Sequence, residues 1–196
     1  MKKSNTQIII IDDELFAHHP LIIKLLQYFE TVKLYKKAAE AIALIKKQLG
    51  EKMILILDMK LSGNEEGYHV FSELREFSYQ VPVIVWTGIS KENGKFFDMI
   101  NLKPYATRDK TTTIDKMTEL VREADSDIKY SLSNALEKWL KEQPGNHDKP
   151  YLISTGGKEY SLNDILNEVR KDTPQGKEFT QDLVNLTIEL MTKKDE

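Results

Sequence analysis

The sequence predicts an α/β fold: a doubly wound five-stranded parallel sheet followed by a small α+β module. Two patterns lead to this prediction. Over about the first 125 of the 196 residues, short apolar runs typical of buried strands alternate with segments whose apolar residues recur every three or four positions. Beyond them, helical spacing continues up to a linker at residues 144–150 that contains two prolines and a glycine, and a hairpin pattern and two helical segments follow.

The strand predictions follow the apolar runs in order. The run at residues 53–57 is apolar at every position, as expected of a central strand covered on both faces. Strands are expected at residues 8–11, 32–35, 53–57 and 81–86, with a fifth at 105–107 where the pattern is weakest. Helices are expected at 14–30, at 38–49, after Gly67 and around 96–100. Pro20 either bends the first helix or marks its start.

A long helical stripe begins at residue 112. Residues 125–127 either divide it into two helices or lie within one. The stripe is longer than one domain face can cover, which predicts a self-association surface and a homodimer. Alternatively, the C-terminal hairpin and helices fold back and cover its far half. The predicted division is a domain at 1–125, a helical extension at 126–143 and a small module at 144–196. The stripe consists of Ile114, Met117, Val121, Ala124, Ile128, Leu132, Ala135 and Trp139.

Composition limits the classes of function. With 40% hydrophobic and 30% charged residues, the chain is expected to be a soluble globular protein. Its apolar runs are far shorter than the ~20 residues of a membrane helix, and the first stops after four residues, too early for a secretory signal, so a cytoplasmic location without membrane contact is expected. The chain has no cysteine, and its neighbouring His18 and His19 are expected on a helix surface rather than as metal ligands.

Five polar residues stand at or just beyond the ends of these apolar runs. Asp12 and Asp13 follow the first run, Asp58 follows the third, Thr87 the fourth and Lys110 the fifth. In an open parallel sheet, ligand sites form at the carboxyl ends of the strands. Three close carboxylates cannot all remain ionised without a compensating cation, and hard oxygen ligands suit Mg²⁺. The sequence therefore predicts an acidic site at one edge of the sheet.

This arrangement resembles the receiver domain of bacterial two-component response regulators. The resemblance covers residues from about 5 to about 125 and is most specific in two segments, IIIIDDE at 8–14 and ILILD at 54–58. It implies that Asp58, on the most central strand, accepts a phosphoryl group from a histidine kinase or phosphotransfer protein. Such a protein is a phosphoacceptor in signalling rather than an enzyme, with slow autodephosphorylation at most.

The resemblance also assigns the other site residues. Asp13 would hold Mg²⁺ directly and Asp12 directly or through water, and the backbone carbonyl of Lys60 would add another oxygen. Lys110 would pair with one phosphoryl oxygen, and the hydroxyl of Thr87 would donate to another.

The chain departs from the usual receiver pattern at several positions. Ser62 and Thr111 stand where proline is frequent, and the loop to Gly67 is one residue longer than its commonest form. Thr107 replaces the aromatic residue that swings inward on phosphorylation in most receivers, and Tyr105 lies two positions earlier. The metal and acceptor residues are intact, so switching is expected to depend on Thr87 and the loop at residues 88–94.

The charge of the C-terminal segment indicates which kind of molecule this protein contacts when it signals. From residue 144 to the end there are seven Lys and Arg against ten Asp and Glu, a balance that opposes contact with a phosphate backbone. The leading hypothesis is therefore phosphorylation-controlled signalling through contact with an unknown downstream protein. Two alternatives stay open: a DNA-binding transcriptional response regulator, and an adaptor with the receiver fold that no longer depends on phosphate.

Overall fold

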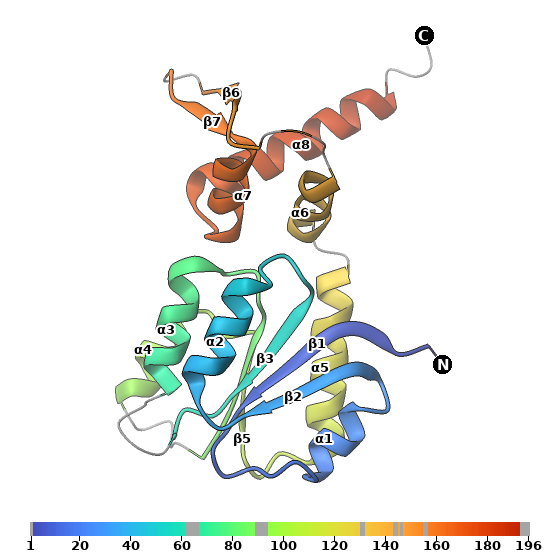
Figure 1. The fold of residues 1–196 in the computed structure, drawn as a ribbon, viewed down its shortest axis with the longest axis vertical. Coiled ribbons are helices and arrows are strands. Elements are labelled where there is room, and N and C mark those ends of the chain that lie inside the picture. The colour runs from blue at the N-terminus through green and yellow to red at the C-terminus, as the bar shows by residue number, and fades with distance from the viewer. Residues whose placement is uncertain are drawn as a thin grey trace. The chain divides into compact units, whose positions relative to one another are not determined.

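The chain divides into two compact units. The computed structural model describes residues 2–61, 67–88, 94–129, 132–142, 145, 147–154 and 157–192 (Figure 1). The first unit comprises residues 1–76 and 81–130, and the second comprises residues 77–80 and 131–196. None of the described helices is long and apolar enough to cross a membrane.

The first unit is built on a five-stranded parallel sheet with the strand order β2-β1-β3-β4-β5. This order confirms the predicted doubly wound sheet, with the change of direction between β1 and β3. Strands β3 and β4 are buried along their whole length, which explains why their sequences are apolar at nearly every position. The strands are β1 (Ser4–Ile11), β2 (Phe29–Tyr35), β3 (Met53–Leu57), β4 (Val83–Thr87) and β5 (Ala106–Asp109).

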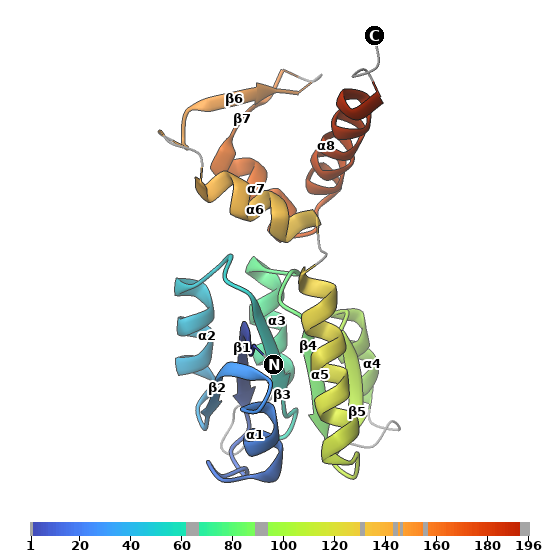
Figure 2. The ribbon, with the colours of Figure 1, turned by 90° about the vertical axis from the view of Figure 1, so that its right-hand side faces the viewer.

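Helices cover both faces of this sheet. One face packs against α1 (Pro20–Leu25) and α5 (Ile114–Lys129), and the other against α2 (Ala38–Lys47), α3 (Gly67–Phe77) and α4 (Gly94–Asn101) (Figures 1 and 2). Alternate strand residues face the α1–α5 side, where they form a buried cluster with both helices: Ile8, Ile10, Ile54, Ile56, Ile84 and Trp86. The carboxyl ends of the strands are left for polar residues.

The first predicted helix is wrong in extent. Helix α1 begins at Pro20 and has six residues, because proline suits the first helical turn while it disfavours the helical conformation in the residue before it. His19 caps the helix, its Nδ1 accepting from the backbone N–H of Leu21 at 3.3 Å. Phe29, expected on the helix face, is instead the first residue of β2, where it pairs with Ser4 and is buried.

The long stripe after residue 112 divides between two helices. Helix α5 runs through residues 125–127 to Lys129, and α6 (Leu132–Glu142) follows. The α5 part of the stripe is covered by the first unit, because Met117, Val121, Ala124 and Ile128 are buried against their own sheet. Self-association through the remaining part stays a prediction.

The second unit has a small core of its own. It contains α6, the antiparallel hairpin of β6 (Pro150–Ile153) and β7 (Glu159–Ser161), and the helices α7 (Leu162–Arg170) and α8 (Pro174–Thr192). The hairpin and the two helices after it were predicted from the sequence, whereas α6 was expected in a separate helical extension and here belongs to the second unit. A capping box at the start of α7 joins Ser161 and Asp164. The buried side chains of this core are Leu136, Tyr160, Ile165, Leu166 and Val169.

Candidate functional site

Parallel pairing brings Asp12 and Asp58 together. Ile11 at the end of β1 is in register with Leu57 at the end of β3, so the aspartates that follow these two residues are neighbours. The backbone N–H of Asp58 donates to the carbonyl of Ile11 at 3.0 Å, which fixes this alignment. Both side chains are buried, Asp12 at 2% and Asp58 at 4% exposure. Buried carboxylates are costly unless they are paired or hydrogen-bonded.

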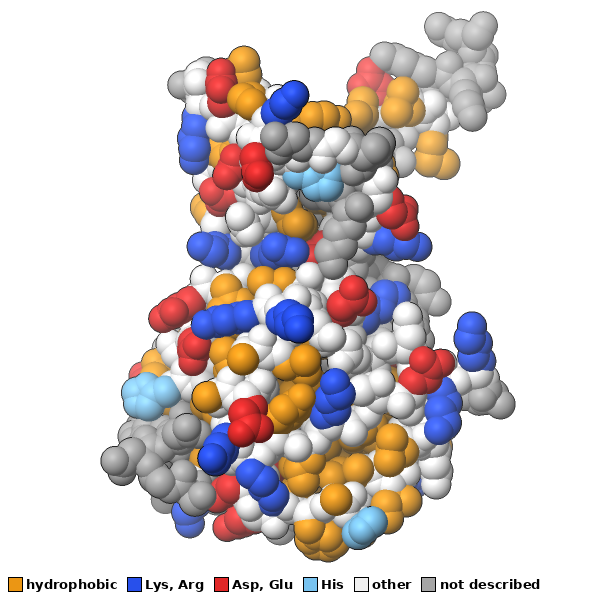
Figure 3. Space-filling view, in the orientation of Figure 1, with side chains coloured by type: hydrophobic (Ala, Val, Ile, Leu, Met, Phe, Trp, Pro, Cys, Tyr) orange, Lys and Arg blue, Asp and Glu red, His pale blue; other side chains and the backbone are white. Residues whose placement is uncertain are grey.

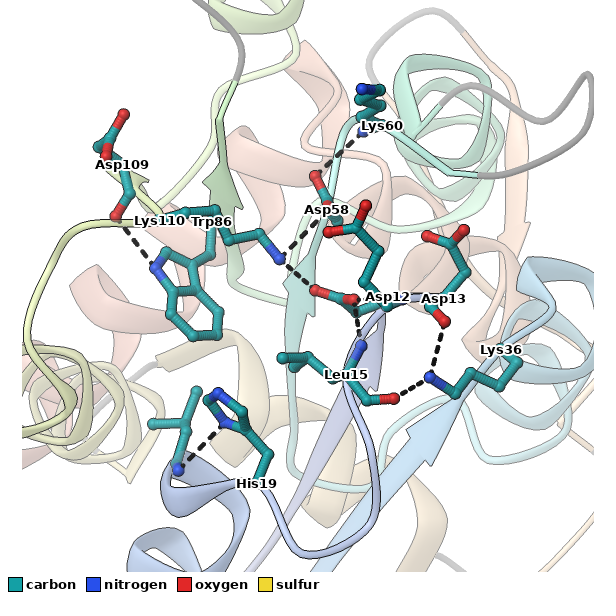
Figure 4. Close-up of polar contacts among 12 residues, drawn as sticks. Asp12, Asp13, Leu15, His19, Lys36, Asp58, Lys60, Trp86, Asp109 and Lys110 are labelled. Atoms are coloured by element: carbon teal, nitrogen blue, oxygen red, sulfur yellow. Dashed lines mark hydrogen bonds and ion pairs between the residues drawn. The ribbon is translucent and has the colours of Figure 1, made fainter.

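Lys110 supplies the pairing for both. Its Nζ lies 3.1 Å from Oδ2 of Asp58 and also forms an ion pair with Oδ2 of Asp12 (Figure 4). Burial lowers the pKa of Lys110, but the hydrogen bond to Asp12 and the charges of Asp58 and Asp12 outweigh it, so that the pKa lies above its usual value. The structure thus joins three of the predicted site residues, from the ends of β1, β3 and β5, through one ammonium.

The other carboxylate oxygens bind backbone N–H groups. Oδ1 of Asp12 accepts from Glu14 at 3.0 Å and from Leu15 at 2.9 Å, which shapes the turn after β1. Oδ1 of Asp58 accepts from the backbone N–H of Lys60 at 3.0 Å. The backbone at residue 60 therefore contacts the predicted acceptor through its N–H, and metal binding by its carbonyl stays a prediction.

Gly67 holds the chain close to Asp58. Its N–H donates to the carbonyl of Met59 at 3.1 Å. A Cβ at this position would lie 2.2 Å from the backbone oxygen of Asp58, far below any real contact distance, so only glycine fits here. Ser62 and the rest of the loop at residues 62–66 lie outside the described residues.

Asp13 and Thr87 border the paired residues. Asp13 is half-buried, and its backbone carbonyl accepts from Nζ of Lys36 at 2.8 Å. Thr87 is the last residue of β4, is 2% exposed and pairs with Asp109, the residue before Lys110. Thr87 is therefore at the expected edge of the sheet. Most of the loop that follows, residues 89–93, lies outside the described residues.

The donor set suits a hard divalent cation in its chemistry. Two buried carboxylates and one ammonium leave a net negative charge, and the ligating atoms that the carboxylates would offer are oxygens. Within the described residues, however, no three carboxylate or imidazole side chains converge into a ready metal site. Mg²⁺ binding by Asp12, Asp13 and Asp58 therefore stays a prediction.

The two positions related to the receiver switch are engaged elsewhere. The hydroxyl of Thr107 lies 3.8 Å from Sδ of Met99 on α4. The hydroxyl of Tyr105 donates to Oδ2 of Asp127 on α5 at 2.7 Å. Burial and this hydrogen bond raise the pKa of Tyr105 to about 12. Tyr105 thus joins β5 to α5 in this structure, and a partial role for it in place of the aromatic switch stays a prediction.

Comparison with solved structures finds many receiver domains. A CheY-like response regulator receiver domain protein from Methanospirillum hungatei JF-1 is 21% identical, with a TM-score of 0.56 over 65% of this chain and 100% of its own. The signal receiver domain of a modulated diguanylate cyclase from Desulfovibrio desulfuricans G20 is 20% identical, with a TM-score of 0.54 over 64% of this chain and 98% of its own. The first unit has the fold of a response regulator receiver domain.

The same fold also occurs in a structure that is described as an enzyme. A structure described as adenylate cyclase from Rhodopirellula baltica is 24% identical, with a TM-score of 0.54 over 71% of this chain and 100% of its own. No protein-family model and no curated protein matches the chain. At these identities the likeness establishes the receiver fold alone.

Three further side chains lie around the site and were not predicted from the sequence. Lys36 directly follows β2, and the rule that polar residues collect at strand ends could have identified it. Trp86 and His19 gave no such signal. His19 was expected on a helix surface, but it is the N-cap of α1 and its ring lies 5.9 Å from that of Trp86. Burial lowers the pKa of His19 more than the charge of Asp12 raises it.

Proposed function

We propose that this chain is a response regulator that accepts a phosphoryl group on Asp58 and signals through protein–protein contacts. One observation carries the proposal: the Lys110 ammonium bridges Asp12 and the buried Asp58 at the carboxyl edge of a receiver-fold sheet. Phosphoryl transfer requires an acceptor oxygen and nearby cationic charge, because negative charge develops on the equatorial oxygens.

The reaction follows from these positions. A carboxylate oxygen of Asp58 attacks the phosphorus of a phosphohistidine, and a phosphorus–oxygen bond forms as the phosphorus–nitrogen bond breaks. The electron pair of the broken bond stays on the imidazole nitrogen of the donor. Lys110, already 3.1 Å from Asp58, pairs with a phosphoryl oxygen, and the hydroxyl of Thr87 donates to another.

Mg²⁺ is part of the proposal. Asp12, Asp13, Asp58 and the carbonyl of Lys60 would hold the ion, which supplies charge neutralisation for the incoming phosphoryl group. The excess of carboxylate over ammonium at the site supports this assignment.

The proposed phosphodonor is a histidine kinase or a phosphotransfer protein in the cytoplasm. Exposed apolar side chains near the acidic edge give such a partner a surface: Phe16 is 58% exposed, Ile23 51% and Leu26 39%. Figure 3 shows hydrophobic side chains gathered over the region of α1 and β2. A partner that binds to this surface would bring its donor histidine near Asp58. The site would stay accessible until that partner binds.

The proposed output is contact with a downstream protein. The excess of acidic residues from residue 144 onward weakens the case for DNA binding. Large apolar side chains of the second unit are exposed, including Tyr151, Ile153 and Leu190, as in surfaces that bind proteins. A gel-shift assay on heterogeneous DNA separates the two outputs, since binding there would favour a transcriptional regulator.

Labelling with a small acyl phosphate in Mg²⁺ tests the central step. Wild-type protein should be phosphorylated once, on Asp58, and Asp58→Asn should not be labelled. Asp13→Asn should fold but lose the rise in melting temperature that Mg²⁺ gives the wild type. Undiminished labelling of Asp58→Asn would refute the acceptor assignment. Unlabelled wild type would leave the phosphate-independent adaptor as the better description.

A further inference from the structure

Trp86 is a buried residue with a polar group to satisfy. It precedes Thr87 on β4 and is 3% exposed. Its side chain belongs to the buried cluster on the α1–α5 face of the sheet. A buried indole N–H requires an acceptor, so the position of the ring is set by more than apolar packing.

The acceptor lies beside Lys110. Nε1 of Trp86 donates to the backbone carbonyl of Asp109 at 3.0 Å. The same carbonyl accepts from the N–H of Thr112 at 2.9 Å, and Oδ1 of Asp109 accepts from the N–H of Thr111 at 2.7 Å. These bonds fix the turn between β5 and α5 on both sides of Lys110. Of these three hydrogen bonds, the one from the indole joins the turn to the neighbouring strand β4.

The face of the same ring carries the ammonium. Nζ of Lys110 lies 4.8 Å from the centroid of the Trp86 ring, within the range of a cation–π interaction. The ammonium is thus held between the indole and the carboxylates of Asp12 and Asp58 (Figure 4). A lysine side chain has four rotatable bonds, and contacts from two sides restrict where its end can lie.

The ring of His19 also contacts the indole. The two ring centroids are 5.9 Å apart at 63°, an edge-to-face arrangement. The position of His19 is itself fixed, because its Nδ1 accepts from the backbone N–H of Leu21 at the start of α1. The Trp86 ring is therefore restrained by the turn before α5 and by the cap of α1.

We propose that Trp86 is a positioning residue for Lys110. Its N–H fixes the backbone before the lysine, and its ring face keeps the ammonium beside Asp58. The proposal rests on the proposed function, in which Lys110 pairs with a phosphoryl oxygen. The placement of the ammonium over the ring, however, can be measured without any phosphoryl transfer.

Proton NMR of the full chain measures this placement. Protons above an aromatic ring resonate upfield, so the Cε methylene of Lys110 should lie upfield of those of the other lysines, with its signal assigned by its loss in Lys110→Gln. Trp86→Leu should abolish the upfield shift and slow the labelling of Asp58 by acetyl phosphate roughly tenfold, the order expected for losing one such interaction and one hydrogen bond.

Two further variants complete the test. Trp86→Phe keeps a ring but lacks the N–H, so it should retain most of the upfield shift and label roughly threefold more slowly. Trp139→Phe alters the other tryptophan, which lies on α6 in the second unit, and should match the wild type in both measurements.

The outcomes separate this proposal from the proposed function. If Trp86→Leu labels at the wild-type rate, or if its Lys110 signal does not move, the positioning role is wrong. If the wild type shows the upfield signal but no labelling, the proposed function fails, and the loss or retention of the signal in Trp86→Leu decides the positioning role. Should Trp86→Leu not fold, a Trp86→Phe variant with the wild-type labelling rate would overturn the proposal.

Discussion

Nζ of Lys110 lies 3.1 Å from Oδ2 of Asp58, and the same ammonium is paired with Asp12. Two buried carboxylates, which follow the adjacent strands β1 and β3, are thus paired with the same ammonium, which follows the edge strand β5. The arrangement links the stability of the resting protein to the residue that is proposed to contact the phosphoryl group.

Removing that cation should destabilise the metal-free protein. Loss of one partner of a buried ion pair costs about 3–5 kcal/mol. Because the Lys110 side chain is 26% exposed, we expect Lys110→Ala to lower the free energy of unfolding by about 2 kcal/mol. Mg²⁺ should raise the melting temperature more in this variant than in the wild type, since the ion replaces the lost charge. The exposed Lys116→Ala on α5 is the matched control, and an equal Mg²⁺ response in both variants would contradict the shared-cation model.

The switch should lie in the loop after β4. Thr107 contacts Met99 and offers no ring to move inward, so closure of Thr87 and the following loop on the phosphoryl group is the remaining local change. Beryllofluoride with Mg²⁺ should increase hydrogen-exchange protection over residues 88–97 in the wild type and leave Asp58→Asn unaffected. Changed protection elsewhere without any change in this segment would show that the mechanism is wrong.

Tyr105 should make the fold sensitive to alkali. Its pKa is raised from 10.0 to about 12 by burial and by its hydrogen bond to Asp127. The folded state therefore keeps this proton after the unfolded state has lost it, so the contribution to stability is full below pH 10 and is lost as the pH rises through about 12. Tyrosinate absorbance should show a late-titrating component from Tyr105. Tyr105→Phe should remove it, whereas Tyr151→Phe, on the exposed strand β6, should not.

The second unit should depend on the ion pair between Glu137 and Arg170. The pair joins α6 to α7 at 2.6 Å, with Glu137 only 1% exposed. Arg170→Ala would leave a buried carboxylate and should cost about 3 kcal/mol, seen as faster hydrogen exchange in both helices. Glu137→Gln removes the charge instead and should cost less. The exposed Lys171→Ala serves as the control, and equal effects of Arg170→Ala and Lys171→Ala would argue against the pair.

Self-association is predicted to involve the second unit. The α5 part of the amphipathic stripe is buried within the first unit, whereas Trp139 on α6 is 43% exposed and Leu190 on α8 is 61% exposed. Light scattering should find a dimer of the full chain and a monomer for a chain ending at residue 130. A monomeric full chain at high micromolar concentration, with and without beryllofluoride, would exclude the dimer.

The sheet could be predicted because its strands are short apolar runs, and the acidic edge could be predicted because its residues directly follow those runs. Asp12 and Asp58 directly follow apolar runs, and parallel pairing then makes them neighbours. Phe29 could not be placed, because its spacing fits the helix stripe and only its pairing with Ser4 assigns it to β2. Trp86 was overlooked for a similar reason, since its partners Asp109 and His19 are distant in sequence and follow no periodic pattern.

The contact of Gly67 with the backbone of Asp58 has a consequence for how this protein can vary. The segment between Asp58 and Gly67 is held close to the acceptor at both ends. Its first end is covalently joined to Asp58, and at its other end Gly67 lies so close to the Asp58 backbone that no side chain would fit. We therefore expect insertions and substitutions between them to leave the acceptor in place. The glycine itself has no such freedom: Gly67→Ala would press directly on the residue proposed to carry the signal.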